Sequence, residues 1–421
     1  MQFLHDTSET IENAIIVGLE DDRDLISIDA SLDELEELAA TAGAVVKGRL
    51  AQKRDRPDVR TFLGSGKLLE LKDLVELAGA DTIIFDSELT PAQLRNLSKE
   101  FDQKIIDRTL LILDIFAMRA NSAEGKVQVE LAQLKYRLSH LSGLGKSLSR
   151  LGGGIGTRGP GETKLETDRR AIRDRISSLN RDLKEIQERR AVLREKRERT
   201  GIPVASMVGY TNAGKSTLLN LLTDASVLAE DKLFATLDTT TRKIELPGGA
   251  EMLYTDTVGF IQKLPHQLVQ AFRATLEELA HADILIHMVD ASNPSREEQM
   301  HVVYDTLQKL KCFDKPIITV FNKVDRDIAL PLPADAYASK VVRMSALTGE
   351  GQETFLLALE DVLKSFKTSL IVLLPYTEGT LTGLIHKSCD ILSEEHTDAG
   401  VRFELYANAE MENRLKPFIT R

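Results

Sequence analysis

The stretch Gly209-Tyr-Thr-Asn-Ala-Gly-Lys-Ser216 decides the fold of this chain, because it satisfies the phosphate-binding pattern G-x-x-x-x-G-K-[S/T] at every fixed position. The apolar run Ile202–Val208 before it predicts a short buried strand, and the leucine-rich segment that begins at Ser216 predicts a helix. In a strand, loop and helix of this kind, backbone N–H groups and the helix N-terminus face phosphate oxygens. We therefore expect Lys215 to reach the β- and γ-phosphates of a nucleotide, and Ser216 to bind Mg²⁺.

Three further segments indicate that the base is guanine. Asp256-Thr-Val-Gly259 follows a predicted strand, where the carboxylate can hold Mg²⁺ through water and the glycine N–H can contact the γ-phosphate. Asn322-Lys-Val-Asp325 follows another apolar run, and the Asp325 carboxylate fits the two adjacent N–H donors of guanine, an edge that adenine lacks. Ser345-Ala-Leu347 fits the loop whose backbone contacts guanine O6. Four such loops in this order predict a guanine-nucleotide switch.

Length and composition exclude several classes of protein. A chain of 421 residues is too long for one core, so two to four domains are expected. The net charge of −11 argues against indiscriminate nucleic-acid binding, so any polyanion site must be a local basic region. Cys312 and Cys389 lack metal-ligand spacing and fit reduced thiols. Because we find neither a membrane-spanning apolar run nor a signal peptide, we expect a cytoplasmic protein.

The first 119 residues alternate predicted strands and helices, as in a small α/β domain. Ser31 is predicted to be the N-cap of the first helix, with Glu34 completing a capping box. Asp86 and Glu88 follow the end of a predicted strand, where α/β folds often bind ligands. Two carboxylates in a loop are more often simply solvated, so we expect both of them to be exposed.

Residues 120–200 predict a helical hairpin. Their apolar side chains recur at alternating spacings of three and four, which is typical of the a and d positions of a coiled coil. The segment 142–162 interrupts this pattern with eight glycines and a proline, which exclude a helix there. We predict an antiparallel two-helix coiled coil with this glycine-rich segment as its tip loop. Lys146, Arg150 and Arg158 suit the tip loop to contact RNA phosphates; a passive linker, and a solvated face for the basic residues of the helices, are the alternatives.

The complete prediction is a multidomain α/β protein. It has an N-terminal α/β domain (1–119), the helical hairpin (120–200), a P-loop GTPase G domain (201–366) and a small C-terminal α/β domain (367–421). In the last of these, no residue suggests chemistry.

Five stretches together are typical of one family: Gly152–Arg170, Val208–Asn220, Leu233–Arg242, Thr255–Glu278 and Phe321–Asp325. Through them the chain resembles the HflX GTPases, which are ribosome-associated translational GTPases. It implies a monomer that binds the large ribosomal subunit and its RNA, hydrolyses GTP and splits stalled or idle ribosomes. A GTPase that assembles the large subunit and an RNA-binding adaptor with slow turnover are the alternatives. A tRNA-modifying GTPase would need a C-terminal cysteine motif that this chain lacks.

The resemblance also places switch I at Leu233–Arg242 and completes the expected site. Catalytic roles are expected for Lys215, Gly259 and Thr236, and Mg²⁺ ligation for Ser216 and Thr236; Thr239, Thr240 and Thr241 are alternatives to Thr236. The residues expected to contact the nucleotide are Gly209, Tyr210, Thr211, Asn212, Ala213, Gly214, Lys215, Ser216, Thr217, Phe234, Ala235, Thr236, Leu237, Asp238, Asp256, Thr257, Val258, Gly259, Asn322, Lys323, Val324, Asp325, Ser345, Ala346 and Leu347.

One position departs from common small GTPases. Phe260 stands where a glutamine often orients the attacking water, and a phenyl ring can neither orient nor polarise water. We therefore expect hydrolysis to be slow in the isolated protein and to depend on a partner. Arg242 could act as an arginine finger in cis, although a structural arginine at the start of a strand is the simpler interpretation.

Overall fold

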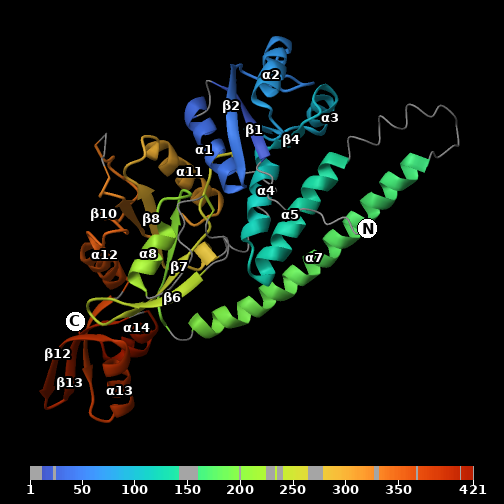
Figure 1. Ribbon diagram of the computed structural model, residues 1–421. Coiled ribbons are helices and arrows are strands. Elements are labelled where there is room, and N and C mark those ends of the chain that lie inside the picture. The colour runs from blue at the N-terminus through green and yellow to red at the C-terminus, as the bar shows by residue number, and fades with distance from the viewer. Residues whose placement is uncertain are drawn as a thin grey trace, which may run out of the picture.

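A computed structural model describes residues 12–21, 25–141, 160–198, 201–223, 233–234, 240–263, 278–326, 331–366, 368–407 and 409–420. Within these residues the strands form three separate sheets, of four, six and three strands (Figure 1). No helix in these ranges is both long and apolar enough to cross a bilayer.

The N-terminal unit is a parallel sheet with helices on both faces. Its strands are ordered β2-β1-β3-β4, and the four helices follow one strand each. The elements are β1 (Glu12–Glu20), α1 (Ile28–Thr41), β2 (Ala44–Lys53), α2 (Ser65–Ala78), β3 (Thr82–Phe85), α3 (Pro91–Glu100), β4 (Lys104–Asp107) and α4 (Arg108–Arg119). Because side chains alternate along β1, Ala14 and Ile16 pack with α1 and α4, whereas Ile15 and Val17 pack with α2 and α3.

Helix α1 begins earlier than its sequence predicts. Ser27 is the N-cap, and its side chain accepts a hydrogen bond from the Ala30 backbone at 3.3 Å. The predicted N-cap at Ser31 is therefore wrong, as is the capping box with Glu34. Two serines four residues apart offer the same local signal, and the earlier one prevails because Ile28 can then pack against the core. Ser31 and Glu34 are consequently available for contacts outside the helix.

Two long helices connect the N-terminal unit to the next sheet. They are α5 (Ala123–Leu141) and α7 (Pro160–Glu198), and they lie side by side in Figure 1. Val129 and Tyr136 of α5 pack in the same core as α4. The less exposed apolar positions of α7 recur at spacings of four and three: Ile172, Ile176, Leu179, Leu183 and Ile186. Helix α5 therefore lies between α4 and α7.

The third unit is the six-stranded G-domain sheet, ordered β10-β9-β8-β5-β7-β6. All neighbours are parallel except β6 and β7. The strands are β5 (Val204–Gly209), β6 (Thr240–Glu245), β7 (Glu251–Asp256), β8 (Ile284–Asp290), β9 (Ile317–Asn322) and β10 (Lys340–Arg343), with α8 (Lys215–Leu222), α11 (Arg296–Lys309) and α12 (Gln352–Ser365). The carboxyl ends of β5, β7 and β9 meet at one edge, where open α/β sheets bind their ligands.

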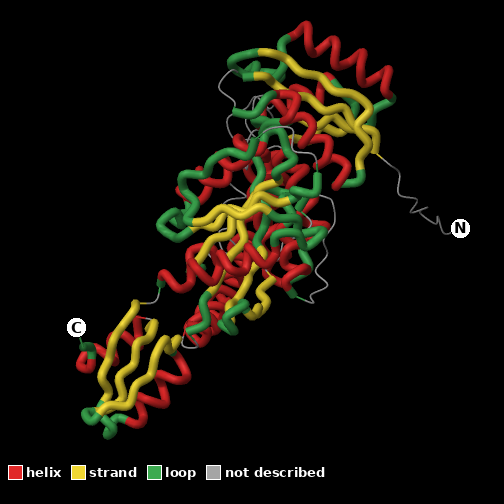
Figure 2. Tube along the Cα trace, turned by 90° about the vertical axis from the view of Figure 1, so that its left-hand side faces the viewer, coloured by secondary structure: helices red, strands yellow, loops and turns green. Residues whose placement is uncertain are grey.

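The C-terminal unit is an antiparallel sheet ordered β11-β13-β12, at the far end of the molecule from the N-terminal unit (Figure 2). Val372, Phe403 and Leu405 of the sheet pack against Ile385 and Leu415 of its helices. The elements are β11 (Thr368–Leu374), α13 (Gly379–Ser388), β12 (Asp390–Thr397), β13 (Gly400–Ala407), α14 (Ala409–Leu415) and the 3₁₀ helix η1 (Lys416–Phe418). This core is separate from that of the G domain.

Candidate nucleotide-binding site

The P-loop joins the end of β5 to the start of α8 and wraps around a buried lysine. Lys215 Nζ donates to the backbone carbonyls of Gly209, at 3.2 Å, and Tyr210, at 2.8 Å. The chain turns through left-handed conformations at Asn212 (φ 60°) and Gly214 (φ 95°). Burial lowers the pKa of Lys215 to about 8, although the Asp256 carboxylate opposes this effect. A phosphate beside this ammonium would favour its charged form.

Ser216 and Asp256 place two oxygen ligands beside the lysine. Ser216 Oγ donates to Asp256 Oδ2 at 2.7 Å, and Asp256 is fully buried at the end of β7. A hydroxyl and a carboxylate are the hard oxygen donors that Mg²⁺ prefers, so these residues fit a magnesium ion. The other expected ligand, Thr236, lies outside the described residues, as do Ala235, Leu237 and Asp238.

Asn322 forms hydrogen bonds to two other predicted loops, the P-loop and the Ser345–Leu347 segment. Its Nδ2 donates to the Ala213 carbonyl at 2.8 Å, and its Oδ1 accepts from the Ala346 N–H at 2.8 Å. A Cβ on Gly214 would collide with Asn322 Nδ2, so the P-loop needs glycine at this position. The asparagine thus fixes the spacing between the phosphate-binding loop and the two loops expected to hold the base.

The residues expected to bind the base lie at the ends of β9 and β10 and in the loops that follow them. Lys323 Nζ pairs with Asp290 Oδ2 at 2.7 Å, which orients the Asn322–Asp325 segment. Asp325 and Leu347 are exposed, whereas Ser345 is fully buried, and Val324 is half-buried. The Asp325 carboxylate is therefore accessible to a ligand, as its predicted role requires.

The segment around Gly259, which is the expected switch II, lies directly against the P-loop. The Phe260 N–H donates to the Gly209 carbonyl at 3.0 Å, and the Thr211 N–H donates to the Phe260 carbonyl at 2.8 Å. A Cβ on Gly259 would lie 2.9 Å from Thr211 Cα and 3.0 Å from Lys215 Nζ, so only glycine allows this approach. Thr257 and Val258 are buried, and Thr257 Oγ1 donates to the Met207 carbonyl. The Gly259 backbone thus adjoins the expected position of the phosphates.

Two aromatic side chains of the switches lie in a core shared with the N-terminal unit. The ring of Phe260 is 3% exposed and belongs to the apolar cluster that also contains Phe116 of α4. Phe234, expected to contact the nucleotide, is buried in the same cluster. Of the remaining P-loop residues, Thr217 is half-buried on α8.

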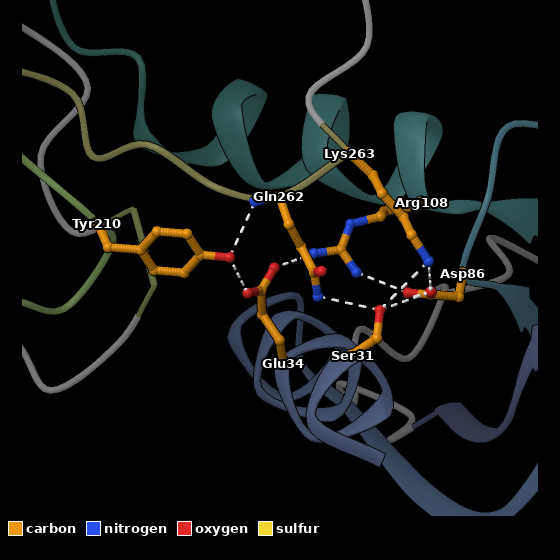
Figure 3. A network of polar contacts seen from close by, with 7 residues as sticks. All are labelled: Ser31, Glu34, Asp86, Arg108, Tyr210, Gln262 and Lys263. Atoms are coloured by element: carbon orange, nitrogen blue, oxygen red, sulfur yellow. Dashed lines mark hydrogen bonds and ion pairs between the residues drawn. The ribbon is translucent and has the colours of Figure 1, made fainter. Parts of the chain in front are cut away.

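The sequence prediction missed residues of the N-terminal unit that reach the site. Glu88 is exposed as expected, but Asp86 is fully buried, and the expectation of exposure is wrong for it. Its carboxylate pairs with Arg108 and with Lys263, which follows switch II (Figure 3). Because these partners are 22 and 177 residues away in the sequence, no local pattern could reveal the pairing.

Comparisons with known proteins agree with this geometry. Residues 29–117 match the family described as GTP-binding GTPase N-terminal, residues 119–197 its middle region, and residues 204–323 the family described as 50S ribosome-binding GTPase. GTPase HflX of Lacrimispora saccharolytica is 52% identical over 401 residues, covering 95% of each chain. GTPase HflX of Escherichia coli is 40% identical over 383 residues, covering 90% of this chain and 89% of the relative.

A solved structure of a GTP-binding protein from Sulfolobus solfataricus in complex with GDP is 25% identical, with a TM-score of 0.43, and covers 84% of this chain and 98% of its own. The family assignment depends on the sequence relatives, which extend over nearly all of both chains. With a P-loop G domain and such relatives, the chain belongs to the HflX family of GTPases and is a GTP hydrolase.

Proposed function

We propose that this protein acts as a cytoplasmic monomer that binds GTP with Mg²⁺, binds the large ribosomal subunit, and splits stalled or idle ribosomes. The observation that carries this proposal is the shared core of the N-terminal unit and the switches. Phe234 and Phe260 pack in one apolar cluster with Phe116 of α4. A change of nucleotide that moves the switches would therefore displace the N-terminal unit as well.

The residues of the P-loop and of the neighbouring loops would each have a role in binding the nucleotide. Lys215 and the P-loop N–H groups would bind the phosphates, Gly259 would contact the γ-phosphate, and Asp325 would bind guanine. Ser216 and Thr236 would hold Mg²⁺, which supplies charge neutralisation for the phosphates. Since Phe260 offers no polar group to the attacking water, the isolated protein would hydrolyse GTP slowly and the ribosome would accelerate it.

Two observations support the large ribosomal subunit as partner. Residues 204–323 of the G domain match a family described as 50S ribosome-binding GTPase, and the relatives align with this chain over most of their length. The second observation concerns α5 and α7, which lie side by side. The last residues of α5 and the first residues of α7 are at the same end of this helix pair (Figure 1). The expected tip loop, 142–162, ends too late, because residues 160–162 already belong to α7. We propose that α5 and α7 form an antiparallel coiled coil and that the segment between them contacts ribosomal RNA.

The domain bounds expected from the sequence are part of the same proposal: 1–119, 120–200, 201–366 and 367–421. In this arrangement the G domain lies between the N-terminal and C-terminal units (Figure 2). Nucleotide-driven motion would therefore reach the hairpin through the N-terminal unit, whose α4 packs against α5.

Sedimentation of ribosomes with this protein under GTP, GDP and a non-hydrolysable GTP analogue tests the proposal. We expect cosedimentation with large subunits under GTP and the analogue but not under GDP, and a fall in light scattering as ribosomes separate. Lys215→Ala, which removes the phosphate-binding ammonium, is the matched control and should do neither. Preference for immature particles would indicate an assembly factor, and binding that ignores the nucleotide would indicate an RNA-binding adaptor; either result contradicts ribosome splitting.

A further inference from the structure

The N-terminal unit presents a buried cluster of charged residues to the G domain (Figure 3). Arg108 is 1% exposed and donates to Asp86 Oδ1 at 2.6 Å and to Glu34 Oε1. Asp86 Oδ2 accepts from Ser31 Oγ at 2.7 Å. Burial lowers the pKa of Arg108 to about 10, so the guanidinium stays charged at neutral pH.

The G domain completes this cluster from its two phosphate-sensing segments. From the P-loop, the Tyr210 hydroxyl donates to Glu34 Oε2. From the residues after switch II, Lys263 Nζ pairs with Asp86 Oδ2 at 2.6 Å, and Gln262 Nε2 donates to Ser31 Oγ at 3.0 Å. The Gln262 N–H also donates to the Tyr210 hydroxyl, at 2.9 Å. The P-loop and switch II are thus bonded both to each other and to α1.

The charged groups of this cluster come from both units. Among the described residues, the N-terminal unit contributes the carboxylates of Glu34 and Asp86 and the guanidinium of Arg108. The G domain contributes the ammonium of Lys263, which pairs with Asp86. Removing one partner from a buried charge pair is strongly unfavourable, because the other charge stays out of water without compensation. Separation of Lys263 from the N-terminal unit breaks its pair with the buried Asp86 and is therefore unfavourable.

We propose that Glu34, Asp86 and Arg108 form a latch that restrains Tyr210 and the Gln262–Lys263 segment and thereby slows nucleotide exchange in the isolated protein. The latch acts through the backbone pairing of Phe260 with the P-loop, since Gln262 follows this pairing by two residues. Any surface that pulls the N-terminal unit away from the G domain would release the latch. These are positioning residues that act through the nucleotide loops, and the inference rests on the nucleotide-binding part of the proposed function.

Nucleotide exchange in the full chain without ribosomes tests the latch. The readout is the dissociation rate of a fluorescent GDP analogue after addition of excess unlabelled GDP. We expect Lys263→Ala and Tyr210→Phe each to accelerate dissociation roughly tenfold, as expected for the loss of one hydrogen bond to a charged group. The double variant should be less than additive, because each change alone already opens the latch.

Two matched controls separate the latch from a general loss of stability. Lys72→Ala removes an ion pair with Glu100, 2.7 Å long, within the N-terminal unit. Tyr304→Phe removes a hydroxyl that donates to Asp335, in the G domain but away from the nucleotide loops. Both controls should exchange nucleotide at the parental rate.

Two results would overturn the latch. One is a GDP dissociation rate within about twofold of the parental rate for both Lys263→Ala and Tyr210→Phe in folded protein. The expected tenfold increase in this rate corresponds to ~1.4 kcal/mol. The other is equal acceleration by the Lys72 and Tyr304 controls. If Lys263→Ala does not fold, the dissociation rate of Tyr210→Phe alone tests the latch, because this variant removes only one hydroxyl and keeps the ring. Failure of the parent chain to bind the analogue at all would instead contradict the proposed function.

Discussion

Phe234 of switch I packs edge-on against Phe116 of α4, with the two ring centroids 4.6 Å apart. Edge-to-face aromatic pairs at this distance are favourable beyond the area they bury. The contact joins the segment expected to form switch I to α4, the helix that follows the last strand of the N-terminal sheet. The N-terminal unit therefore makes an apolar contact with Phe234 of switch I and polar contacts with the residues that follow switch II.

The first prediction concerns this apolar contact. Phe116 is 1% exposed, so Phe116→Ala should lower the free energy of unfolding by about 3–5 kcal/mol, through lost burial and a residual cavity. Met118→Ala on the same helix is the control, because Met118 is 57% exposed and should change stability little. Thermal unfolding measures both. Equal melting temperatures for Phe116→Ala and the parent would show that the interface does not depend on this ring.

Base specificity gives the second prediction. Asp325→Asn replaces one carboxylate oxygen that would accept from guanine with an amide that donates. Preference should therefore shift from GTP toward xanthosine triphosphate, whose base presents an acceptor at that edge. Asp361→Asn, an exposed carboxylate on α12, should leave both affinities unchanged. Nucleotide titration provides the test, and unaltered GTP affinity in Asp325→Asn would remove the guanine assignment.

The third prediction concerns the tip loop, which lies mostly outside the described residues. Replacing residues 152–161 with a short neutral linker should spare GTP binding and abolish ribosome splitting, because the loop is outside the G domain in sequence. Changing Lys146, Arg150 and Arg158 together to alanine should weaken ribosome binding and flatten its salt dependence. Each lost phosphate contact should reduce the slope by about one. A linker variant that splits ribosomes like the parent in light scattering would make the loop a passive connection.

The fourth prediction concerns the pH dependence of stability. Burial lowers the pKa of His287 to about 4 from its ordinary 6.5, although Asp335 opposes the shift. Between these values the unfolded chain binds a proton that the folded chain excludes. Stability should therefore fall as pH decreases through this window, by ~1.4 kcal/mol per pH unit from this residue.

His287→Phe removes this titration and keeps a ring against Tyr304, so stability should depend less steeply on pH between 6.5 and 4. His301→Gln, exposed on α11, is the control and should retain the parental slope. Denaturant unfolding at several pH values compares the slopes. Parallel curves for His287→Phe and the parent would show that the buried histidine is not the source.

The sequence predicts those parts of the protein that depend on contiguous residues. The P-loop and Asn322–Asp325 each place their polar groups within one short loop after a strand, so their patterns are complete in the sequence. Ser31 and Asp86 show the opposite case. Ser31 satisfies a local capping rule that Ser27 satisfies one turn earlier. Asp86 is buried because of charges supplied by distant segments, and such compensation leaves no signal near residue 86.

The ion pair between Asp86 and Lys263 has an evolutionary consequence. Because Lys263 pairs with a buried carboxylate that another unit contributes, a change of charge at either position is unfavourable unless the other position changes to match. Residues 86 and 263 should therefore covary among relatives, and the two units should be inherited together. A chimaera that joins the N-terminal unit of one relative to the G domain of another would be viable only where both parents carry the same pair.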